Sequence, residues 1–154
     1  MALRCYSLLL LTFSCLLWVG CAANKSGTQL SANPGPTDLD APAEFSATSS
    51  GLKYKILRKS DANLPKPSST VTVNYRGWLD DGTVFDSSYD RGSPATFGLN
   101  QVIPGWTEGL QLIGEGGMIE LEIPSALGYG PQGAGRDIPP NSRLHFIVEL
   151  INVQ

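Results

Sequence analysis

Apolar and polar residues alternate along much of the chain after residue 50, and a period of two residues predicts strands. The clearest case runs from Thr70 to Leu79, where Val71, Val73 and Tyr75 fall on one face and polar residues fall on the other. Further strands are predicted over 51–58, 84–87, 95–98, 118–123 and 143–153. The apolar faces of these strands are able to build a common core.

A helical pattern interrupts the strands between residues 100 and 117. Trp106, Leu110 and Ile113 recur at i, i+4 and i+7, which places them on one face of a helix. Pro104 and Gly105 indicate a turn before this helix, and the glycines that follow Ile113 indicate its end. One short helix cannot bury its own apolar face. We therefore expect a curved sheet that closes over the helix, with Trp106 at the contact.

Residues 1–20 have the pattern of a secretory signal peptide. Arg4 precedes an apolar run over 8–19, which is shorter than the roughly 20 residues that span a bilayer. Gly20 and Cys21 follow, and this ending resembles the bacterial lipobox, in which a cysteine becomes lipid-modified and N-terminal. Trp18 departs from that motif, where leucine is usual. Cleavage after one of the next two alanines is the alternative, and it would release a soluble periplasmic protein.

Residues 21–50 are predicted to form a flexible linker, because they are rich in small and polar residues and show no apolar period. If Cys21 is acylated, this segment is a tether between membrane and domain, with ends on the order of 30 Å apart. Without the acyl chain it is a disordered tail with no assigned task. The folded domain is predicted to occupy residues 51–154.

Composition and charge exclude several classes of function for this domain. The net charge of −3 over 154 residues provides no basic surface for nucleic acid. The three cysteines lie at positions 5, 15 and 21, so the domain has no disulfide framework or cysteine-based metal site. The one histidine, His145, is predicted on the outward face of the last strand. We expect neither a metal nor a cofactor.

Large aromatic residues come from several predicted strands, from the helix and from the long Gly/Pro-rich loop over 124–141. These residues are Tyr75, Phe85, Phe97, Trp106, Tyr129 and Phe146. A domain of about 100 residues needs fewer large aromatic side chains to fill its centre. Some of them are therefore expected to line a cavity between the sheet and the helix.

Three long motifs occur in order: VTVNYRGWLDDGTVFDSS, VIPGWTEGLQLIGEGG and IPSALGYGPQGAGRDIPPNSRLHFIVELINV. They resemble the FKBP-type peptidyl-prolyl cis-trans isomerases, in particular the bacterial secreted and lipoprotein members, which include the macrophage-infectivity-potentiator type. The similarity covers 51–154. It implies an α+β fold in which five or six antiparallel strands form a curved sheet wrapped around one short helix.

The resemblance also implies an apolar pocket whose floor is Trp106. On the family pattern, the other pocket residues are Tyr75, Phe85, Asp86, Phe97, Val102, Ile103, Tyr129, Ile138 and Phe146. This sequence departs from the family at Ala95, where an aromatic residue is usual, and at Asp137, where a second apolar residue is usual. Both positions bear on the affinity for macrolide drugs and on substrate preference.

Isomerisation of an X-Pro bond requires neither a nucleophile nor a metal, because no bond to a heavy atom breaks. An apolar site that favours the twisted amide is sufficient. The family suggests that the Tyr129 hydroxyl and the Ile103 backbone N–H hold the substrate carbonyls. Asp86 either accepts a hydrogen bond from the Tyr75 hydroxyl or faces the rotating carbonyl. Its alternative role is to cap the local backbone of a turn.

The resulting hypothesis is a monomeric prolyl isomerase that acts on proline-containing peptides and unfolded exported proteins in the bacterial cell envelope. Its pocket is a candidate site for macrolide immunosuppressants. With Cys21 acylated, the protein would be a periplasm-facing outer-membrane lipoprotein, since Ala22 rather than Asp follows the cysteine. Two rival hypotheses are a module that binds proline peptides with little catalysis and a purely structural lipoprotein. The aromatic set favours the enzyme.

Overall fold

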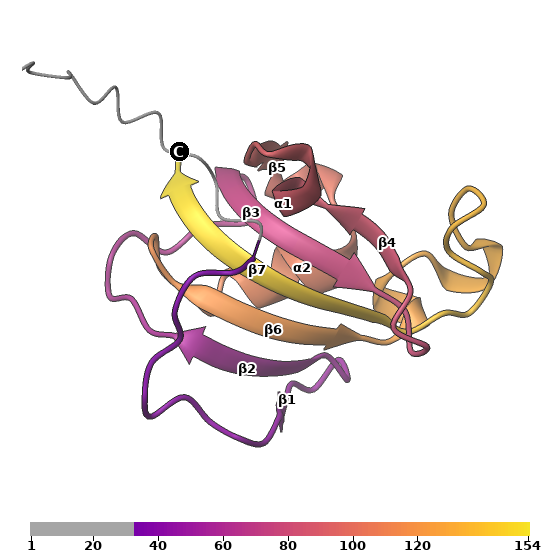
Figure 1. Ribbon diagram of the computed structural model, residues 1–154, viewed down its shortest axis with the longest axis horizontal. Helices are drawn as coiled ribbons and strands as arrows, with labels where there is room; N and C mark the ends of the chain where they lie inside the picture. Colours follow the sequence, from indigo (N-terminus) through magenta and orange to yellow (C-terminus); the bar gives the residue numbers. More distant parts are fainter. Residues whose placement is uncertain (1–32) are drawn as a thin grey trace, which may run out of the picture.

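The computed structural model describes residues 33–154, which form one antiparallel sheet with helices packed against it. The strands are β1 (Ser46–Ala47), β2 (Lys53–Arg58), β3 (Thr70–Trp78), β4 (Val84–Ser87), β5 (Ala95–Gly98), β6 (Met118–Ile123) and β7 (Leu144–Val153). Their order is β1-β2-β6-β7-β3-β4, and β5 pairs with β3 (Figure 1). The predicted α+β class with an antiparallel sheet is confirmed. The sheet has more strands than expected, because β1 is a two-residue strand inside the predicted linker.

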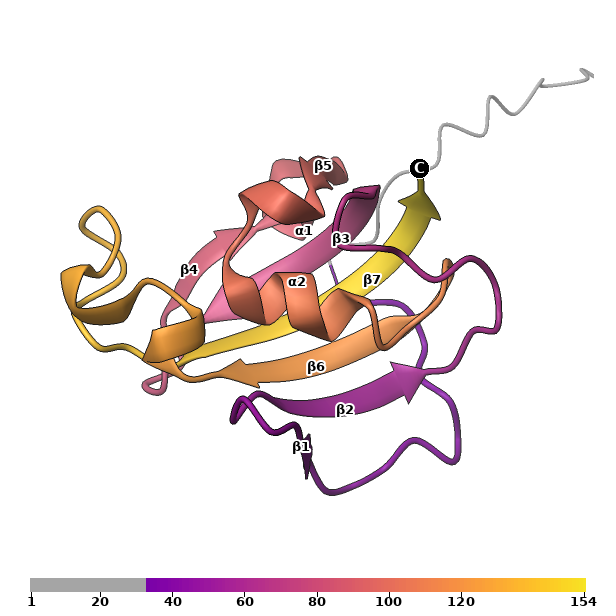
Figure 2. The ribbon, with the colours of Figure 1, turned by 180° about the vertical axis from the view of Figure 1, so that it is seen from behind.

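The helix α2 (Pro104–Leu110) lies across β6 and β7 on one face of the sheet (Figure 2). The other helical elements are α1 (Ser88–Arg91) and the 3-10 turns η1 (Leu99–Gln101), η2 (Ser125–Leu127) and η3 (Gly130–Gln132). The inward-facing apolar residues of β3, β6 and β7 are buried in one core with Trp106 and Leu110 of α2, as the alternation of apolar residues requires. They include Val71, Val73, Ile119, Leu121, Ile123, Leu144, Phe146, Val148 and Leu150.

Gly105 belongs to α2 itself rather than to a turn before it, and its role is a close approach to the sheet. A Cβ atom at this position would lie 2.5 Å from Cγ2 and 2.9 Å from Cδ1 of Ile123 in β6. One helical turn later, a Cβ at Gly109 would lie 2.8 Å from Cδ2 of Leu121. The two glycines therefore allow the backbone of α2 to pack directly on β6.

The helix ends one turn earlier than the sequence pattern predicts. After Leu110 the hydrogen bonds tighten to three-residue spacing, from Leu112 N to Gly109 O (3.1 Å) and from Ile113 N to Leu110 O (3.4 Å). Ile113 is still buried, so its predicted place in the core is right although it lies outside the helix. The period of the pattern identifies the buried face, and the tightened last turn sets the length of the helix.

A helical turn, α1, lies between the predicted strands over 84–87 and 95–98, where the sequence patterns predicted no helix. The Ser87 hydroxyl accepts a hydrogen bond from the backbone N–H of Asp90 (3.2 Å) and caps the N-terminus. Gly92 closes the other end with a positive φ of 70°. Serine before the first turn and glycine after the last are the usual cap residues. Both cap residues are present in the sequence, but a helix of four residues is too short to show a helical period.

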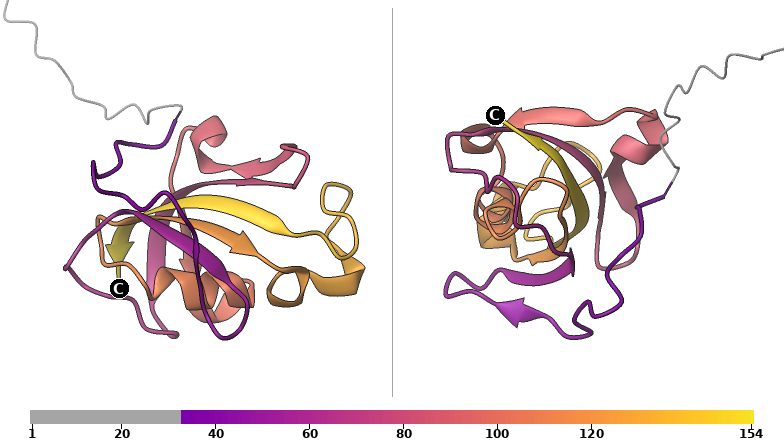
Figure 3. Two further views of the ribbon diagram at one scale, coloured as in Figure 1. Left: turned by 90° about the horizontal axis from the view of Figure 1, so that it is seen from below. Right: turned by 90° about the vertical axis from the view of Figure 1, so that its left-hand side faces the viewer.

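The ordered domain begins before the predicted boundary at Gly51. The backbone N–H of Gly35 donates to Oε1 of Glu149 in β7 (2.6 Å), and Asp38 N donates to Leu57 O (2.8 Å). In the right-hand view of Figure 3, this indigo segment runs on the side of the sheet away from α2. β1 then pairs with β2. Within residues 33–154, no helix has the length and apolar character needed to cross a membrane.

We expect Gly105→Ala to destabilise the domain by about 1–3 kcal/mol, because the added methyl group overpacks against Ile123. Ile123 is β-branched and fully buried, so its side chain has little room to move. Urea unfolding of the variant and the wild type measures the difference. Glu108→Ala, on the same helix, is the control, since its carboxylate accepts only a surface hydrogen bond from Ser50 (2.7 Å). An unchanged or raised unfolding midpoint for Gly105→Ala would contradict the close packing of α2.

Candidate active site

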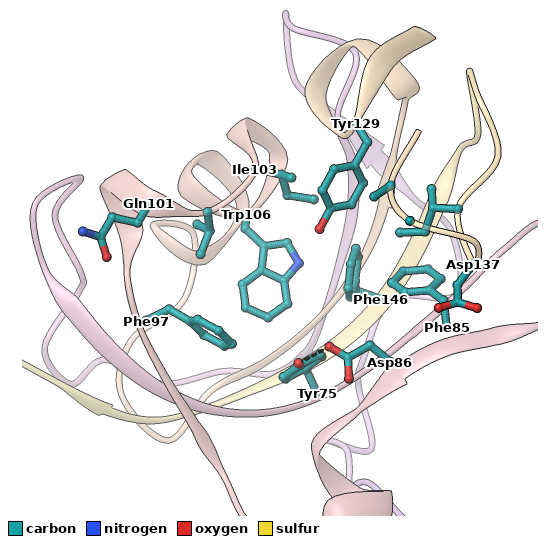
Figure 4. A pocket seen from close by; sticks show the side chains of 14 residues that line it. Tyr75, Phe85, Asp86, Phe97, Gln101, Ile103, Trp106, Tyr129, Asp137 and Phe146 are labelled. Atoms are coloured by element: carbon teal, nitrogen blue, oxygen red, sulfur yellow. Dashed lines mark hydrogen bonds between the residues drawn. The ribbon is translucent and has the colours of Figure 1, made fainter. Parts of the chain in front are cut away.

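The structure brings together the ten pocket residues predicted from the sequence, around a pocket of about 700 Å³ (Figure 4). They are Tyr75, Phe85, Asp86, Phe97, Val102, Ile103, Trp106, Tyr129, Ile138 and Phe146. Gln101, Ala134, Gly135 and Asp137 complete the lining. Of the two departures from the family pattern, Asp137 lines the pocket, whereas Ala95 pairs with Val73 in the sheet. The predicted lipidation site, Cys21, lies outside the described residues.

Trp106 forms the floor of the pocket. Its ring is buried, and three aromatic rings meet it at nearly perpendicular angles, with centroid distances of 5.1 Å to Tyr75, 5.2 Å to Phe146 and 5.7 Å to Phe97. Edge-to-face contacts of this kind hold each ring in a defined orientation. In residues 33–154, the indole Nε1–H has no hydrogen-bond partner. A buried donor without a partner is available to a ligand that enters the pocket.

Gly77 in β3 makes room for the two phenylalanines on one side of the pocket. The rings of Phe85 and Phe146 pack edge to face at 5.4 Å. A Cβ at Gly77 would lie 2.6 Å from an atom of each ring. The sequence patterns predicted no role for this glycine. Its signal is a glycine inside a strand, which often marks a close approach to the backbone.

The carboxylate of Asp86 is held by two side chains at the pocket wall. The Tyr75 hydroxyl donates to Oδ2 of Asp86, as one of the predicted roles required (Figure 4). Arg91 donates to Oδ1 of Asp86 through Nη1 and to the Tyr75 hydroxyl through Nη2 (2.9 Å). Asp86 is thus oriented by side chains rather than serving as a backbone cap. Arg91 belongs to α1 and was missed because the sequence patterns predicted no helix in that segment.

This arrangement keeps the Tyr75 hydroxyl protonated well into the alkaline range. Burial, and then the hydrogen bond to Asp86, raise the pKa of Tyr75 to about 12. The hydrogen bond from Arg91 acts in the opposite direction. The pKa of Arg91 is itself raised by its hydrogen bonds to Tyr75 and Asp86. Tyr75 therefore remains a donor that fixes the orientation of the Asp86 carboxylate.

The short helix that carries Arg91 is anchored on the other side of β3. Tyr89 is buried, and its hydroxyl donates to Oε1 of Glu149 (2.7 Å). Burial and this bond raise the pKa of Tyr89. Ser88 is also buried, and its hydroxyl accepts from the backbone N–H of Tyr75 (2.8 Å). These contacts hold α1 against the sheet and so position Arg91 beside Asp86.

The loop after β6 forms the opposite wall of the pocket. Ala134 and Ile138 exchange two backbone hydrogen bonds, of 2.9 and 3.1 Å, which fold the loop tip into a small hairpin. Ile138 is buried, whereas the Tyr129 side chain is 42% exposed. The Tyr129 hydroxyl points toward the centre of the pocket in Figure 4. It is therefore placed to form a hydrogen bond with a ligand in the pocket.

His145 faces away from the pocket, as predicted. Its Nε2 lies 2.7 Å from Oδ1 of Asp80, and its ring stacks on Trp78 at an interplanar angle of 14°. Among residues 33–154, no group of three or more His, Cys, Asp or Glu side chains is arranged to hold a metal ion.

Comparisons with known proteins agree with this geometry. The family described as FKBP-type peptidyl-prolyl cis-trans isomerase matches residues 61–151. A probable FKBP-type peptidyl-prolyl cis-trans isomerase of Haemophilus influenzae is 53% identical over 110 residues, covering 71% of this chain and 46% of the relative. The outer membrane protein MIP of Legionella longbeachae is 51% identical over 105 residues, covering 68% of this chain and 45% of the relative.

A solved structure, FkpA from Escherichia coli, superimposes with a TM-score of 0.71 at 50% sequence identity. The match covers 73% of this chain and 53% of that one. The chain thus spans about half the length of the curated relatives that it matches.

We expect Asp86→Asn to lower the pKa of Tyr75, because the substitution removes a negative charge that raises it. NMR titration of isotope-labelled tyrosine rings measures this value, and Tyr75→Phe assigns the signal. Asp61→Asn, which neutralises an exposed carboxylate outside the pocket, should leave the Tyr75 pKa unchanged. A wild-type pKa at or below the ordinary value of about 10 would contradict the Tyr75–Asp86 bond.

The same shift makes the folded domain sensitive to alkali. Because the folded-state pKa of Tyr75 is raised, its contribution to stability is complete below pH ~10, where unfolded tyrosine begins to ionise. The contribution is lost as the pH rises through about 12. The free energy of unfolding, measured with urea at increasing pH, should therefore fall over this window, and less steeply in Tyr75→Phe.

Proposed function

This chain belongs to the family of FKBP-type peptidyl-prolyl cis-trans isomerases, and we propose that it accelerates the isomerisation of X-Pro bonds in exported proteins. The observation that carries the proposal is the pocket itself, in which five aromatic side chains from five separate segments converge on the buried floor of Trp106. A proline ring fits such an apolar enclosure. Burial of the ring supplies the binding energy.

The pocket lowers the rotation barrier through the apolar character of its walls. Rotation of an X-Pro bond breaks amide resonance and takes tens to hundreds of seconds without a catalyst. The twisted amide is less charge-separated than the planar one, so apolar walls favour it over the ground state. Catalysis requires this difference, because equal binding of both states would leave kcat unchanged.

Polar groups at the pocket wall hold the peptide while the bond rotates. The Tyr129 hydroxyl and the backbone N–H of Ile103 are the donors for the substrate carbonyls. Asp86, held by Tyr75 and Arg91, presents an oriented carboxylate beside the rotating amide. Fixing both sides of the proline restricts the motion to the one bond.

The second candidate function is binding of proline peptides with little catalysis. The nearly complete aromatic set and the oriented Asp86 favour the enzyme. The two functions differ in one measurement, since a binding module would associate with an X-Pro peptide without changing its rate of isomerisation. We propose further that the domain acts as a monomer and that its pocket also accepts macrolide immunosuppressants.

We also propose that the protein is tethered in the bacterial envelope through an acylated Cys21. Relatives of this chain include an outer membrane protein. The ordered segment that follows Asn33 contacts the domain at Glu149, on the face of the sheet away from α2. A tether attached there leaves the pocket open to substrate. Cleavage after Ala22 or Ala23, giving a soluble periplasmic protein, is the alternative.

Asp86→Leu and Phe85→Tyr are expected to lower kcat/KM about tenfold, or about 1.4 kcal/mol, while the circular dichroism spectrum stays unchanged. The first removes the oriented carboxylate, and the second places a hydroxyl in the apolar wall. A protease-coupled assay on a short X-Pro peptide measures the rate. Matched controls are Asp61→Leu and Phe45→Tyr, neither of which alters the pocket. Full activity in both pocket variants would refute the assignment.

Acylation of Cys21 predicts that radiolabelled palmitate enters the wild-type protein in a bacterial host and does not enter Cys21→Ser. Both proteins should retain their isomerase activity, because the pocket is built by residues between positions 75 and 146. One acyl chain binds a membrane only with K on the order of 10⁴ M⁻¹, so stable anchoring depends on the several chains that lipoprotein processing adds. Absence of label from the wild type would favour the soluble form.

A further inference from the structure

The charged residues of the pocket lining are all acidic. Among its 14 residues, Asp86 and Asp137 carry carboxylates, and no lysine, arginine or histidine is present. The remainder of the lining is apolar or neutral. A peptide that enters the pocket therefore meets negative charge at the wall and no positive charge in the lining to balance it.

The two carboxylates differ in how they are compensated. Asp86 forms an ion pair with Arg91 and accepts the Tyr75 hydroxyl. Asp137 is exposed and forms no hydrogen bond or ion pair with any residue in 33–154. Its chain neighbour Arg136 is exposed as well and does not line the pocket. Asp137 is thus the carboxylate of the lining that remains free for a substrate.

The position of Asp137 is set by the folded loop. Its neighbour Ile138 is buried and is bonded through its backbone to Ala134, so Asp137 sits on an anchored segment. In Figure 4 its carboxylate lies beside Phe85, at the end of the pocket away from Phe97 and Gln101. Asp137 thus lies at the rim of the pocket. When the proline ring of a peptide lies on the Trp106 floor, a residue on one side of the proline comes near this rim.

We propose that Asp137 makes this site selective for X-Pro segments in which a lysine or arginine flanks the proline, and that acidic flanking residues are disfavoured. The inference rests on the proposed isomerase function and names its substrate class. An unpaired carboxylate can attract a cation without first breaking an ion pair. At an exposed rim, the attraction is worth a factor of several and is screened by salt.

The test compares three peptides that differ only in the residue beside the proline, which is lysine, leucine or glutamate. Each is made with that residue before the proline and, in a second set, after it. We expect kcat/KM, normalised to the uncatalysed rate of each peptide, to be roughly three- to tenfold higher for lysine than for glutamate in one of the sets at low salt. This ratio should fall toward one at about 1 M salt, where the Debye length is ~3 Å.

Asp137→Asn assigns the effect to its source. The amide keeps the shape of the side chain and removes its charge, so the lysine-to-glutamate ratio should collapse and lose its dependence on salt. Asp61→Asn changes the net charge equally, at an exposed site outside the pocket, and should preserve the ratio. A ratio that survives in Asp137→Asn, or that collapses in Asp61→Asn, overturns the assignment to Asp137.

A binding measurement separates this inference from the proposed function. The same peptides are titrated into the protein while the indole N–H signal of Trp106 is followed by NMR. If no peptide isomerises faster, the proposed function fails, and the binding titration still reports the charge preference. Equal affinity for the lysine and glutamate peptides, together with equal rates if the protein is active, overturns the selectivity.

Discussion

The contact between α2 and β6 is the packing constraint on which the site depends. Gly105 and Gly109 bring the backbone of the helix onto Ile123 and Leu121, at distances that no larger residue would allow. This close approach holds the Trp106 ring over the sheet, where it belongs to the buried core and also forms the floor of the pocket. The rings around it then meet edge to face and enclose a space of about 700 Å³.

A polar network on β3 and α1 supports one wall of this apolar pocket. The Asp86 carboxylate is held in one orientation because Tyr75 and Arg91 each donate a hydrogen bond to one of its oxygens. Arg91 is in turn positioned by α1. The Tyr89 hydroxyl of this helix donates a hydrogen bond to Glu149 on the far side of the sheet. The Glu149 carboxylate also accepts a hydrogen bond from the backbone N–H of Gly35. The segment that leads from the linker and the wall of the pocket therefore share one partly buried carboxylate.

Much of the fold and of the site could be predicted from the order of residues along the chain. The alternation in β3, β6 and β7 identified the buried face of each strand, and the helical period identified Trp106 and Leu110. The motif resemblance named ten residues that the fold does gather into one pocket. The errors lay where local signals are short or ambiguous. α1 has only four residues, and Gly105 is as typical of a turn as of a close helix–sheet contact.

The sequence by itself determined the antiparallel class, the buried faces and the family, because periodicity, turn residues and motifs are properties of neighbouring positions. The tertiary structure alone decided which distant groups meet. The Tyr89–Glu149 bond, the place of Gly77 beneath two rings and the ordered course of residues 35–47 join segments far apart in the chain. It also decided that Asp86 is compensated and Asp137 is not, because pairing depends on distance in space, which a position in the sequence does not state.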